Sequence, residues 1–360
     1  NICGARPNFM KIAPIMEAMK NSKKIEPFLV HTGQHYDEKM SESFFKALGI
    51  PEPDVNLEVG SGTHASQTAE IMTRFEKVCD KENPDLVLVV GDVNSTMACT
   101  LVAVKKHIKT AHVEAGLRSG DRNMPEEINR IVTDSICDYY FTTDPAGERH
   151  LLESGVDKSR VFFTGNVMID TLLKNLEKAD SQDILQRLGL EKGSYCSMTM
   201  HRPSNVDDKN NLEGLVNAFG KIQERIKMVF PAHPRTVKML KEFGLFEKVE
   251  SMPGFILIEP VNYHEMLCLN KNAGFVLTDS GGLQEETTVL GVPCITMRNN
   301  TERPVTAEIG TNEVTGNDPD KVLDAVERIL SGKWKKGRIP EKWDGHAGER
   351  IVEVLEGMSL

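Results

Sequence analysis

Residues 86–116 read LVLVVGDVNSTMACTLVAVKKHIKTAHVEAG, and the pattern of this stretch decides the fold class. The apolar run Leu86–Val90 shows no alternation with polar residues, which is typical of a strand covered on both faces. Leu101–Ile108 is predicted to be helical, and Thr110–Val113 is a second short β-rich run. A strand, a helix and a strand in this order indicate a βαβ unit and therefore a parallel sheet.

Short β-rich runs and longer helical stretches alternate along the whole chain. A second βα series begins at Tyr195, after a long helical stretch over Ile169–Leu190 whose polar runs make it a plausible domain boundary. We therefore expect an α/β fold of two doubly wound, Rossmann-like domains that face a cleft. The other predicted strands are 28–31, 139–142, 161–164, 195–200, 227–231, 255–259, 275–278 and 294–297.

The length of 360 residues allows about two domains at ~150 residues each. The formal net charge is −10, whereas nucleic-acid-binding proteins usually carry a basic excess, so nucleic acid is not an expected partner. No apolar run reaches the ~18 residues that span a bilayer, and no signal peptide opens the chain, so we expect a cytoplasmic protein without a membrane partner. The chain reaches the strand-like Ile2-Cys3 at once, which indicates that a few residues of the first strand precede it.

The seven cysteines lie far apart in the sequence, and no two of them form a CxxC pair. This spacing fits neither a zinc ribbon nor a disulfide framework. Most of the cysteines stand inside apolar runs, so we expect buried, reduced thiols.

Polar residues follow directly after almost every predicted strand. In a doubly wound sheet the ligand binds beyond the carboxyl ends of the strands, so these residues mark the expected site. Ordinary turn chemistry explains any one of them but not the whole series. The series consists of Gly33-Gln34-His35, Gly91-Asp92, Glu114, Gly165-Asn166, His201-Arg202, His233-Pro234 and Asp279-Ser280.

The loop GARPNFMK, residues 4–11, is the first candidate phosphate site. It is not a GxGxxG fingerprint, and the chain has no GxxxxGK[ST] motif, so neither a nicotinamide cofactor nor a P-loop nucleotide is supported. Arg6 and Lys11 instead flank the start of a predicted helix, an arrangement that suits a diphosphate. Surface salt bridges made by both residues are the alternative interpretation.

The second candidate phosphate site is DSGGLQEE, residues 279–286, after the predicted strand 275–278. Gly281 and Gly282 allow a ligand to approach the backbone N–H groups, and the helix that begins at Ser280 supplies a positive dipole end. The alternative is an ordinary Asp or Ser N-cap with a flexible turn. Glu286 could accept hydrogen bonds from ribose hydroxyls, whereas Glu285 is interpreted as a complement to the dipole.

The stretch HVEAGLRSGDRNMPEEINR is the richest in charged side chains. Glu126 and Glu127 open a predicted helix, where they could simply complement the dipole, and Glu126 could pair with Arg130 at i,i+4. Neither role explains Asp92 and Glu114, each of which follows a strand of the same half. We expect Asp92, Glu114 and Glu126 to converge, because acid/base work on both faces of a substrate requires several carboxylates.

Histidines end two strands of the second half, at His201 and His233, and Arg303 adds a cation after another strand. A lone histidine is more often a structural hydrogen-bonding group, but two at strand ends near a predicted phosphate loop favour a ligand role. No pair of these histidines has metal-ligand spacing, so we expect no metal site.

These motifs together resemble the non-hydrolysing UDP-N-acetylglucosamine 2-epimerases nearly from end to end. Each motif alone is weak, but so many of them in the same order are specific. The resemblance rests on GARP at 4–7 with Lys11, GQH at 33–35, GDVNST at 91–96, HVEAGLR at 112–118, PEEINR at 125–130, HR at 201–202, HPRT at 233–236, DSGGLQEE at 279–286 and TERP at 301–304.

The resemblance implies a glycosyltransferase-B-type fold with UDP held mainly by the second domain. The first domain would then comprise residues 1–168 and 346–360, with the last helix crossing back to it, and the second domain residues 169–345. Acid/base chemistry near the sugar is assigned by resemblance to Asp92, Glu114, Glu126 and His201. The nucleotide and its phosphates would be held by Arg6, Lys11, His201, His233, Ser280, Gly281, Gly282, Glu286 and Arg303.

One motif departs from the family pattern. Many bacterial members read HRREN where this chain has HRPSN at 201–205. In those enzymes this stretch and the Gln-His loop contribute to a second, activating substrate site. Gln34, His35 and Arg202 are therefore candidate activator-binding residues, and the departure leaves both the activation and the exact UDP-sugar open.

The resemblance implies reversible conversion of UDP-N-acetylglucosamine to UDP-N-acetylmannosamine through loss and re-addition of UDP, without NAD or metal, in a homodimer. A hydrolysing epimerase, which releases free N-acetylmannosamine, and a 2-epimerase of a modified UDP-acetamido sugar are the alternatives. A glycosyltransferase of the same fold would not need three clustered carboxylates. A nucleotide-sugar sensor would be hindered by them, because nearby carboxylates repel an anionic ligand.

Overall fold

The computed structural model describes residues 1–34 and 49–358, and for Arg6 only the backbone. The chain divides into two compact units, Asn1–Lys174 with Glu341–Leu360, and Asn175–Pro340. Each unit contains parallel β-sheet with helices, so the predicted α/β class with two doubly wound domains is confirmed. The expected cleft between them stays a prediction.

Parallel strands form the centre of the first unit. One set of three has the order β1-β2-β3 and one set of four the order β4-β5-β6-β7, with β1 beside β4. The very short β3 has no counterpart among the predicted strands. The bounds are β1 Ile2–Cys3, β2 Val30–His31, β3 Val55–Asn56, β4 Leu86–Val90, β5 Lys109–Val113, β6 Tyr139–Thr142 and β7 Val161–Phe163.

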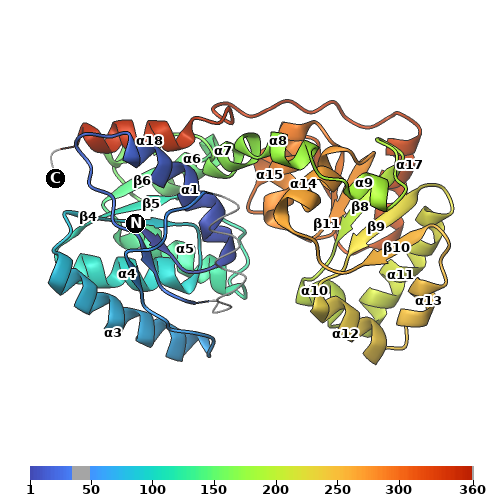
Figure 1. The fold of residues 1–360 in the computed structure, drawn as a ribbon, viewed down its shortest axis with the longest axis horizontal. Coiled ribbons are helices and arrows are strands. Elements are labelled where there is room, and N and C mark those ends of the chain that lie inside the picture. The colour runs from blue at the N-terminus through green and yellow to red at the C-terminus, as the bar shows by residue number, and fades with distance from the viewer. Residues whose placement is uncertain (35–48, 359–360) are drawn as a thin grey trace. The chain divides into compact units, whose positions relative to one another are not determined.

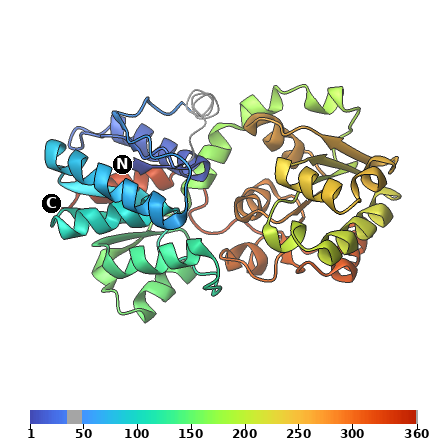
Figure 2. The ribbon, with the colours of Figure 1, turned by 90° about the horizontal axis from the view of Figure 1, so that it is seen from below.

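Helices cover both faces of these strands (Figure 1). The helices α1, α7 and α18 pack together as one group, and α3, α4 and α5 form the other group. Helices α3 and α4 lie side by side in both ribbon views (Figures 1 and 2). The bounds are α1 Arg6–Lys20, α3 His64–Glu82, α4 Asn94–Lys105, α5 Pro125–Ile136, α6 Pro145–Glu153, α7 Val167–Lys174 and α18 Ala347–Glu356, and a 3-10 helix covers Lys158–Arg160.

The first unit extends to Lys174, whereas the expected boundary lay after residue 168. The reason is the packing of α7 on α1 and α18. The Thr171 hydroxyl donates to the Met10 carbonyl at 2.5 Å. The Asp170 carboxylate accepts hydrogen bonds from the first two N–H groups of α18, at 3.1 and 2.7 Å.

The chain returns to the first unit at Glu341, five residues before the expected boundary at 346. Trp343 explains the difference, because its side chain is fully buried there. Its indole N–H donates to the Thr143 carbonyl of the same unit at 2.9 Å.

The second unit contains six parallel strands in the order β10-β9-β8-β11-β12-β13. The order reverses between β8 and β11, and in open α/β sheets ligands bind at such a switch point, outside the carboxyl ends of the strands. The sequence pattern did not reveal β13. The bounds are β8 Tyr195–Thr199, β9 Lys227–Pro231, β10 Phe255–Ile258, β11 Phe275–Thr278, β12 Cys294–Thr296 and β13 Asn312–Val314.

Ten described helices surround this sheet, and the core between them is rich in phenylalanine. The long helix expected over 169–190 is three helices, since buried Asn175 separates α7 from α8 and bonds His264 of α14 at 2.8 Å. The bounds are α8 Leu176–Asp180, α9 Ile184–Arg187, α10 Pro203–Val206, α11 Lys209–Gln223, α12 Pro234–Glu242, α13 Phe246–Glu250, α14 Tyr263–Lys271, α15 Gly281–Leu290, α16 Pro304–Glu308 and α17 Pro319–Leu330.

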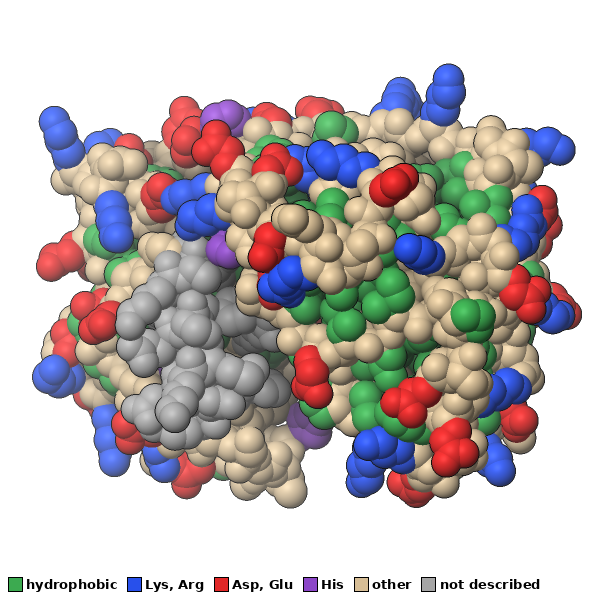
Figure 3. All heavy atoms as spheres, turned by 45° about the vertical axis from the view of Figure 1, so that its right-hand side comes forward, with side chains coloured by type: hydrophobic (Ala, Val, Ile, Leu, Met, Phe, Trp, Pro, Cys, Tyr) green, Lys and Arg blue, Asp and Glu red, His purple; other side chains and the backbone are tan. Residues whose placement is uncertain are grey.

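All seven cysteines are buried and unpaired, as expected. On the face shown in Figure 3, acidic and basic side chains are intermixed, and neither sign forms a continuous patch. Among the described residues, no helix is both long enough and apolar enough to cross a bilayer.

Candidate functional site

The first cluster of site residues lies where β4 and β5 end. Asp92 follows β4, Glu114 follows β5, and Lys11 reaches Glu114 from the second turn of α1. The Lys11 ammonium is 2.5 Å from a carboxylate oxygen of Glu114, and both side chains are buried. The surface salt bridge considered for Lys11 is therefore wrong, because its ion pair is an interior one.

Gly91 gives Lys11 the space to approach this cluster. Its φ is +68°, a value that glycine adopts without strain. A Cβ added there would lie 2.7 Å from the Lys11 nitrogen. The glycine before Asp92 is thus favoured by its backbone conformation, and a larger residue there would displace the ammonium group beside it.

Buried Asn8 attaches the first loop to the end of β4. Its Oδ1 accepts from the N–H groups of Gly4 and Ala5, and its Nδ2 donates to the Val90 carbonyl at 2.9 Å. The start of α1 is held beside Asp92 in this way. Arg6 is the first residue of that helix, and its side chain lies outside the described part of the structure.

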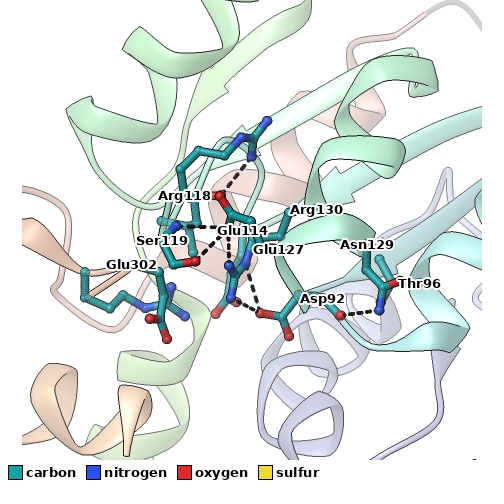
Figure 4. A network of polar contacts seen from close by, with 12 residues as sticks. Asp92, Thr96, Glu114, Arg118, Ser119, Glu127, Asn129, Arg130 and Glu302 are labelled. Atoms are coloured by element: carbon teal, nitrogen blue, oxygen red, sulfur yellow. Dashed lines mark hydrogen bonds and ion pairs between the residues drawn. The ribbon is translucent and has the colours of Figure 1, made fainter. Parts of the chain in front are cut away.

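Asp92 is held by an arginine of α5 (Figure 4). Nε and Nη2 of Arg130 donate to one Asp92 oxygen at 3.0 and 2.6 Å, and Asn129 donates to the Asp92 carbonyl at 2.9 Å. Nη1 of Arg130 donates to Glu127 at 2.6 Å. This network fixes the Asp92 side chain from the helix behind it.

Glu127, rather than Glu126, is the buried carboxylate at the start of α5. It accepts from the N–H groups of Ser119 and Gly120 at 2.9 and 3.0 Å. Burial alone would raise the pKa of Glu127, but these bonds and Arg130 outweigh it and lower that pKa below its usual value. The proposed Glu126–Arg130 pair is wrong, because Arg130 bonds the other glutamate.

The structure therefore brings together Asp92 and Glu114 at neighbouring strand ends, whereas Glu126 is exposed at the first turn of α5. The bonds that Arg130 makes to Asp92 and Glu127 were not predicted from the sequence. A glutamate three residues before an arginine was the available signal. It gave no reason to prefer that pairing over the i,i+4 pair.

The second cluster lies at the switch point between β8 and β11. Buried Asp279, after β11, holds the loop after β8: one oxygen is 3.0 Å from Nδ1 of His201, and the other accepts from the N–H groups of His201 and Arg202. Burial would raise the pKa of Asp279, but the His201 bond and these N–H groups lower it. Asp279 thus connects the ends of the two central strands, β8 and β11, through these contacts.

Ser280 is the N-cap residue of α15, but its side chain makes no capping hydrogen bond. The alternative of an ordinary side-chain N-cap is therefore wrong for this helix. A Cβ added at Gly281 would lie 2.5 Å from a Glu302 oxygen, so a larger residue there would displace the Glu302 side chain. Gly282 follows in the same first turn, where backbone N–H groups are available to an anion.

His233 ends β9 and lies beside His201, with ring centroids 5.8 Å apart. It caps α12, where its Nδ1 accepts from the Arg235 N–H at 3.2 Å. Burial, and then the neighbouring His201 and Arg235, lower the pKa of His233. The His233 ring is therefore held mainly neutral at neutral pH.

Glu286 lies in the second turn of α15 and is buried. Burial and then the neighbouring Glu285 raise its pKa to about 8. The Tyr263 hydroxyl is buried and has no hydrogen-bond partner among the described residues. Burial and the nearby Glu286 raise the pKa of Tyr263, and no motif in the sequence marks this tyrosine as part of the site.

Arg303 is buried and donates to Glu285 at 2.5 Å. Glu285 is fully buried, so the interpretation that it only complements the helix dipole is wrong. The pair holds the Arg303 side chain close to α15, and the Glu285 carboxylate of that helix balances its charge. The backbone of Arg303 caps α16.

The candidate activator-binding residues have structural contacts. Buried Gln34 accepts from the N–H and the hydroxyl of Ser95, at 3.1 and 2.8 Å, and so holds the start of α4. Arg202 donates to the Asp279 carbonyl at 3.0 Å. His35 lies outside the described residues.

The part of the chain that the structure describes contains no group of three side chains suited to hold a metal ion.

The family model for UDP-N-acetylglucosamine 2-epimerase matches residues 17–356. The UDP-N-acetylglucosamine 2-epimerase of Methanocaldococcus jannaschii is 45% identical over 361 residues, which cover 98% of this chain and 97% of that protein.

A crystal structure of UDP-GlcNAc 2-epimerase from Methanocaldococcus jannaschii, in complex with UDP-GlcNAc and UDP, matches with a TM-score of 0.88 and 45% identity over 98% of both chains. The UDP-2,3-diacetamido-2,3-dideoxy-D-glucuronate 2-epimerase of Pseudomonas aeruginosa is 38% identical, over 98% of both chains. The family expected from the motifs is confirmed. This chain belongs to the UDP-N-acetylglucosamine 2-epimerase family.

Proposed function

We propose that this protein converts UDP-N-acetylglucosamine reversibly to UDP-N-acetylmannosamine by inverting C2. The observation that carries the proposal is the buried Lys11–Glu114 ion pair beside Asp92 in a chain of this family. A comparison also supports the proposal, because a similar protein was crystallised in complex with UDP-GlcNAc and UDP.

The C2 proton of a nucleotide sugar has no adjacent carbonyl to acidify it, so its removal is coupled to loss of UDP. A carboxylate takes the proton while the electron pair of the C2–H bond forms a C1–C2 double bond. The C1–O bond breaks, and its electrons leave with UDP, which gives a glycal. Protonation of C2 from the other face and return of the UDP oxygen to C1 complete the inversion.

Asp92 and Glu114 are assigned to these proton transfers, because they lie at neighbouring strand ends and are held by Arg130 and Lys11. Glu126 and His201 are kept as further acid/base candidates, since both side chains are exposed. The proposal needs no redox cofactor and no metal. Turnover that survives dialysis against EDTA is the expected result, and its loss would contradict this part.

The nucleotide is assigned to the second unit. The first turn of α15, with Gly281 and Gly282, offers backbone N–H groups to the diphosphate, and Ser280 offers its hydroxyl, which makes no capping bond. His201 and His233 flank it, and Glu286 with Tyr263 offers polar groups to the ribose hydroxyls. Arg6, Lys11 and Arg303 are assigned to the phosphates by family resemblance.

A modified UDP-acetamido sugar is the second candidate substrate, because the relative from Pseudomonas aeruginosa is named for such a sugar and is 38% identical. A hydrolysing reaction is the other alternative. Incubation with UDP-N-acetylglucosamine in deuterated water, followed by proton NMR, separates the three.

Deuterium at C2 of UDP-N-acetylmannosamine, without net loss of UDP-sugar, is the expected result. Free N-acetylmannosamine with UDP indicates the hydrolysing reaction. No exchange with this substrate, but exchange with a UDP-diacetamido sugar, moves the substrate assignment and leaves the reaction class intact. The cytoplasmic location and the homodimer stay predictions, and sedimentation analysis tests the latter.

A further inference from the structure

A buried histidine–aspartate pair lies beside the two proposed reacting carboxylates and has no part in the proposed chemistry. His112 belongs to β5 and Asp134 to α5, and both are almost completely buried. Nδ1 of His112 is 2.7 Å from one oxygen of Asp134. A pair this deeply buried needs other partners that compensate its lost hydration.

The His112 ring is attached to the loop that carries Asp92. Its second nitrogen, Nε2, is 2.8 Å from the carbonyl oxygen of Gly91, the residue before Asp92. A carbonyl only accepts, so Nε2 donates to it. Nδ1 in turn faces the Asp134 carboxylate, so both nitrogens of the buried ring have a partner.

The Asp134 carboxylate is attached to the loop that carries Glu114. Its second oxygen accepts from the N–H of Gly116 at 3.0 Å and from the Arg118 guanidinium at 2.6 Å. Burial would raise the pKa of Asp134, but the charges and bonds of His112 and Arg118 lower it, so Asp134 is ionised.

The Glu114 loop requires support of this kind. Glu114 itself has a φ of +67°, a left-handed conformation that is strained for a residue with a side chain. Gly116 has a φ of +79°, and a Cβ there would lie 2.1 Å from the Gly147 carbonyl. Asp134 bonds the chain on both sides of Glu114, through His112 before it and Gly116 after it.

We propose that His112 and Asp134 are positioning residues that hold the Asp92 and Glu114 loops at one fixed separation. The role rests on the proposed function, in which Asp92 and Glu114 transfer the C2 proton. Neither His112 nor Asp134 is assigned to contact substrate. Their bonds run to the backbone that sets where the two carboxylates lie.

The test compares D134N with D138N in the full-length protein. Asp138 makes matched bonds at the opposite end of the same strand, where its carboxylate accepts from the N–H and hydroxyl of Thr110 at 2.9 and 3.1 Å. A purely structural role predicts that both variants lose stability and that neither loses kcat while folded. A positioning role predicts that D134N alone lowers kcat, by about tenfold or more, with little change in KM, because small misplacements of reacting groups are costly.

A second measurement keeps the test valid if D134N does not fold. Nitrogen-15 NMR of the histidine-labelled wild type, with H112Q for assignment, should show a proton on Nε2 of His112, because this nitrogen donates to the Gly91 carbonyl. A His112 ring without a proton on Nε2 overturns the bond to the Asp92 loop and with it the positioning role of His112. Equal kcat in folded D134N and D138N overturns the positioning role of Asp134. A wild type without turnover on any UDP-acetamido sugar overturns the proposed function, and the positioning role with it, whatever the NMR spectrum shows.

Discussion

At the scale of single residues, the site in the first unit depends on which cationic side chains can approach the ends of β4 and β5. Gly91 leaves room for the Lys11 ammonium, and Lys11 holds Glu114. Arg130 holds Asp92 from the other side. Each carboxylate is thus fixed by its own cation, and substitutions that remove the carboxylate charge should affect chemistry more than nucleotide binding.

We expect E114Q and D92N each to lower kcat by about 100-fold or more, because proton transfer by a placed group contributes on that order. The affinity for UDP, measured by calorimetry, should stay within a few-fold, since the nucleotide is assigned to the second unit. E153Q is the control, because that side chain is exposed at the end of α6 in the same unit and has no assigned role. Unchanged turnover in E114Q would remove Glu114 from the proton-transfer residues.

Alanine at Gly91 should displace Lys11 and lower kcat, since the new methyl group would lie 2.7 Å from its nitrogen. The matched control is G155A, which has a φ of +87° and nothing within 4 Å of the added Cβ. Both variants should lose about 1 kcal/mol of stability from backbone strain. An equal kcat in the two, measured with the folded proteins, would contradict the role given to Gly91.

The buried Glu286 makes stability depend on pH. Its pKa of about 8 in the folded protein lies above the ordinary value of 4.5, so folding favours the protonated form. Its contribution to the free energy of unfolding is fully present below about pH 4.5 and is lost as the pH rises through about 8.

Urea denaturation of the wild type and of E286Q at about pH 6 and about pH 9 measures this effect. The wild type should lose up to several kcal/mol more than E286Q over that interval, at ~1.4 kcal/mol per pKa unit. Parallel losses in the two proteins would show that Glu286 is ionised at both pH values.

At the scale of elements, two helix starts are treated in opposite ways. The first turn of α18 is closed by Asp170, whose carboxylate accepts from the N–H groups of Ala347 and Gly348. The first turn of α15 has no side-chain cap at Ser280. The capped start serves packing within the first unit, whereas the uncapped start remains available to an anionic ligand.

Replacement of Asp170 by alanine should lower the free energy of unfolding by ~1–3 kcal/mol, because two buried N–H groups lose their acceptor. Hydrogen exchange at the start of α18 should rise with it. D318A is the control, since Asp318 caps α17 at an exposed position and should cost ~1 kcal/mol. Equal losses in the two variants would contradict a special role for Asp170.

At the scale of the whole molecule, the second unit is a continuous piece of chain inserted into a discontinuous first unit. Residues 175–340 have their own sheet and core and carry the groups assigned to the nucleotide. Such a piece is expected to fold alone.

The fragment 175–340 should therefore bind UDP, though more weakly than the full chain because it lacks Arg6 and Lys11, and should show no turnover. Calorimetry of the fragment and of the full chain measures the difference, and G282P in the fragment is the control, since proline in the first turn of α15 removes one of the N–H groups assigned to the diphosphate. A folded fragment without UDP binding would contradict the assignment of the nucleotide to the second unit.

The sequence by itself determined the α/β class, most strands, and the loops that carry the candidate residues. The strands appear in the sequence as continuous apolar runs that end in Gly, Asp, Glu or His, and this pattern depends only on residues that are neighbours along the chain. Leu86–Val90 followed by Gly91-Asp92 is one example. The ordered motifs also identified the family.

Only the tertiary structure decided which charges meet. Arg130 bonds Glu127 and Asp92 instead of Glu126, and Glu285 pairs with Arg303, because these choices depend on which helix face is buried and on residues far apart in sequence. The ends of the first unit likewise followed from the contacts of Asp170 and Trp343. Periodicity describes one element at a time, whereas buried ion pairs are set by the packing of several elements together.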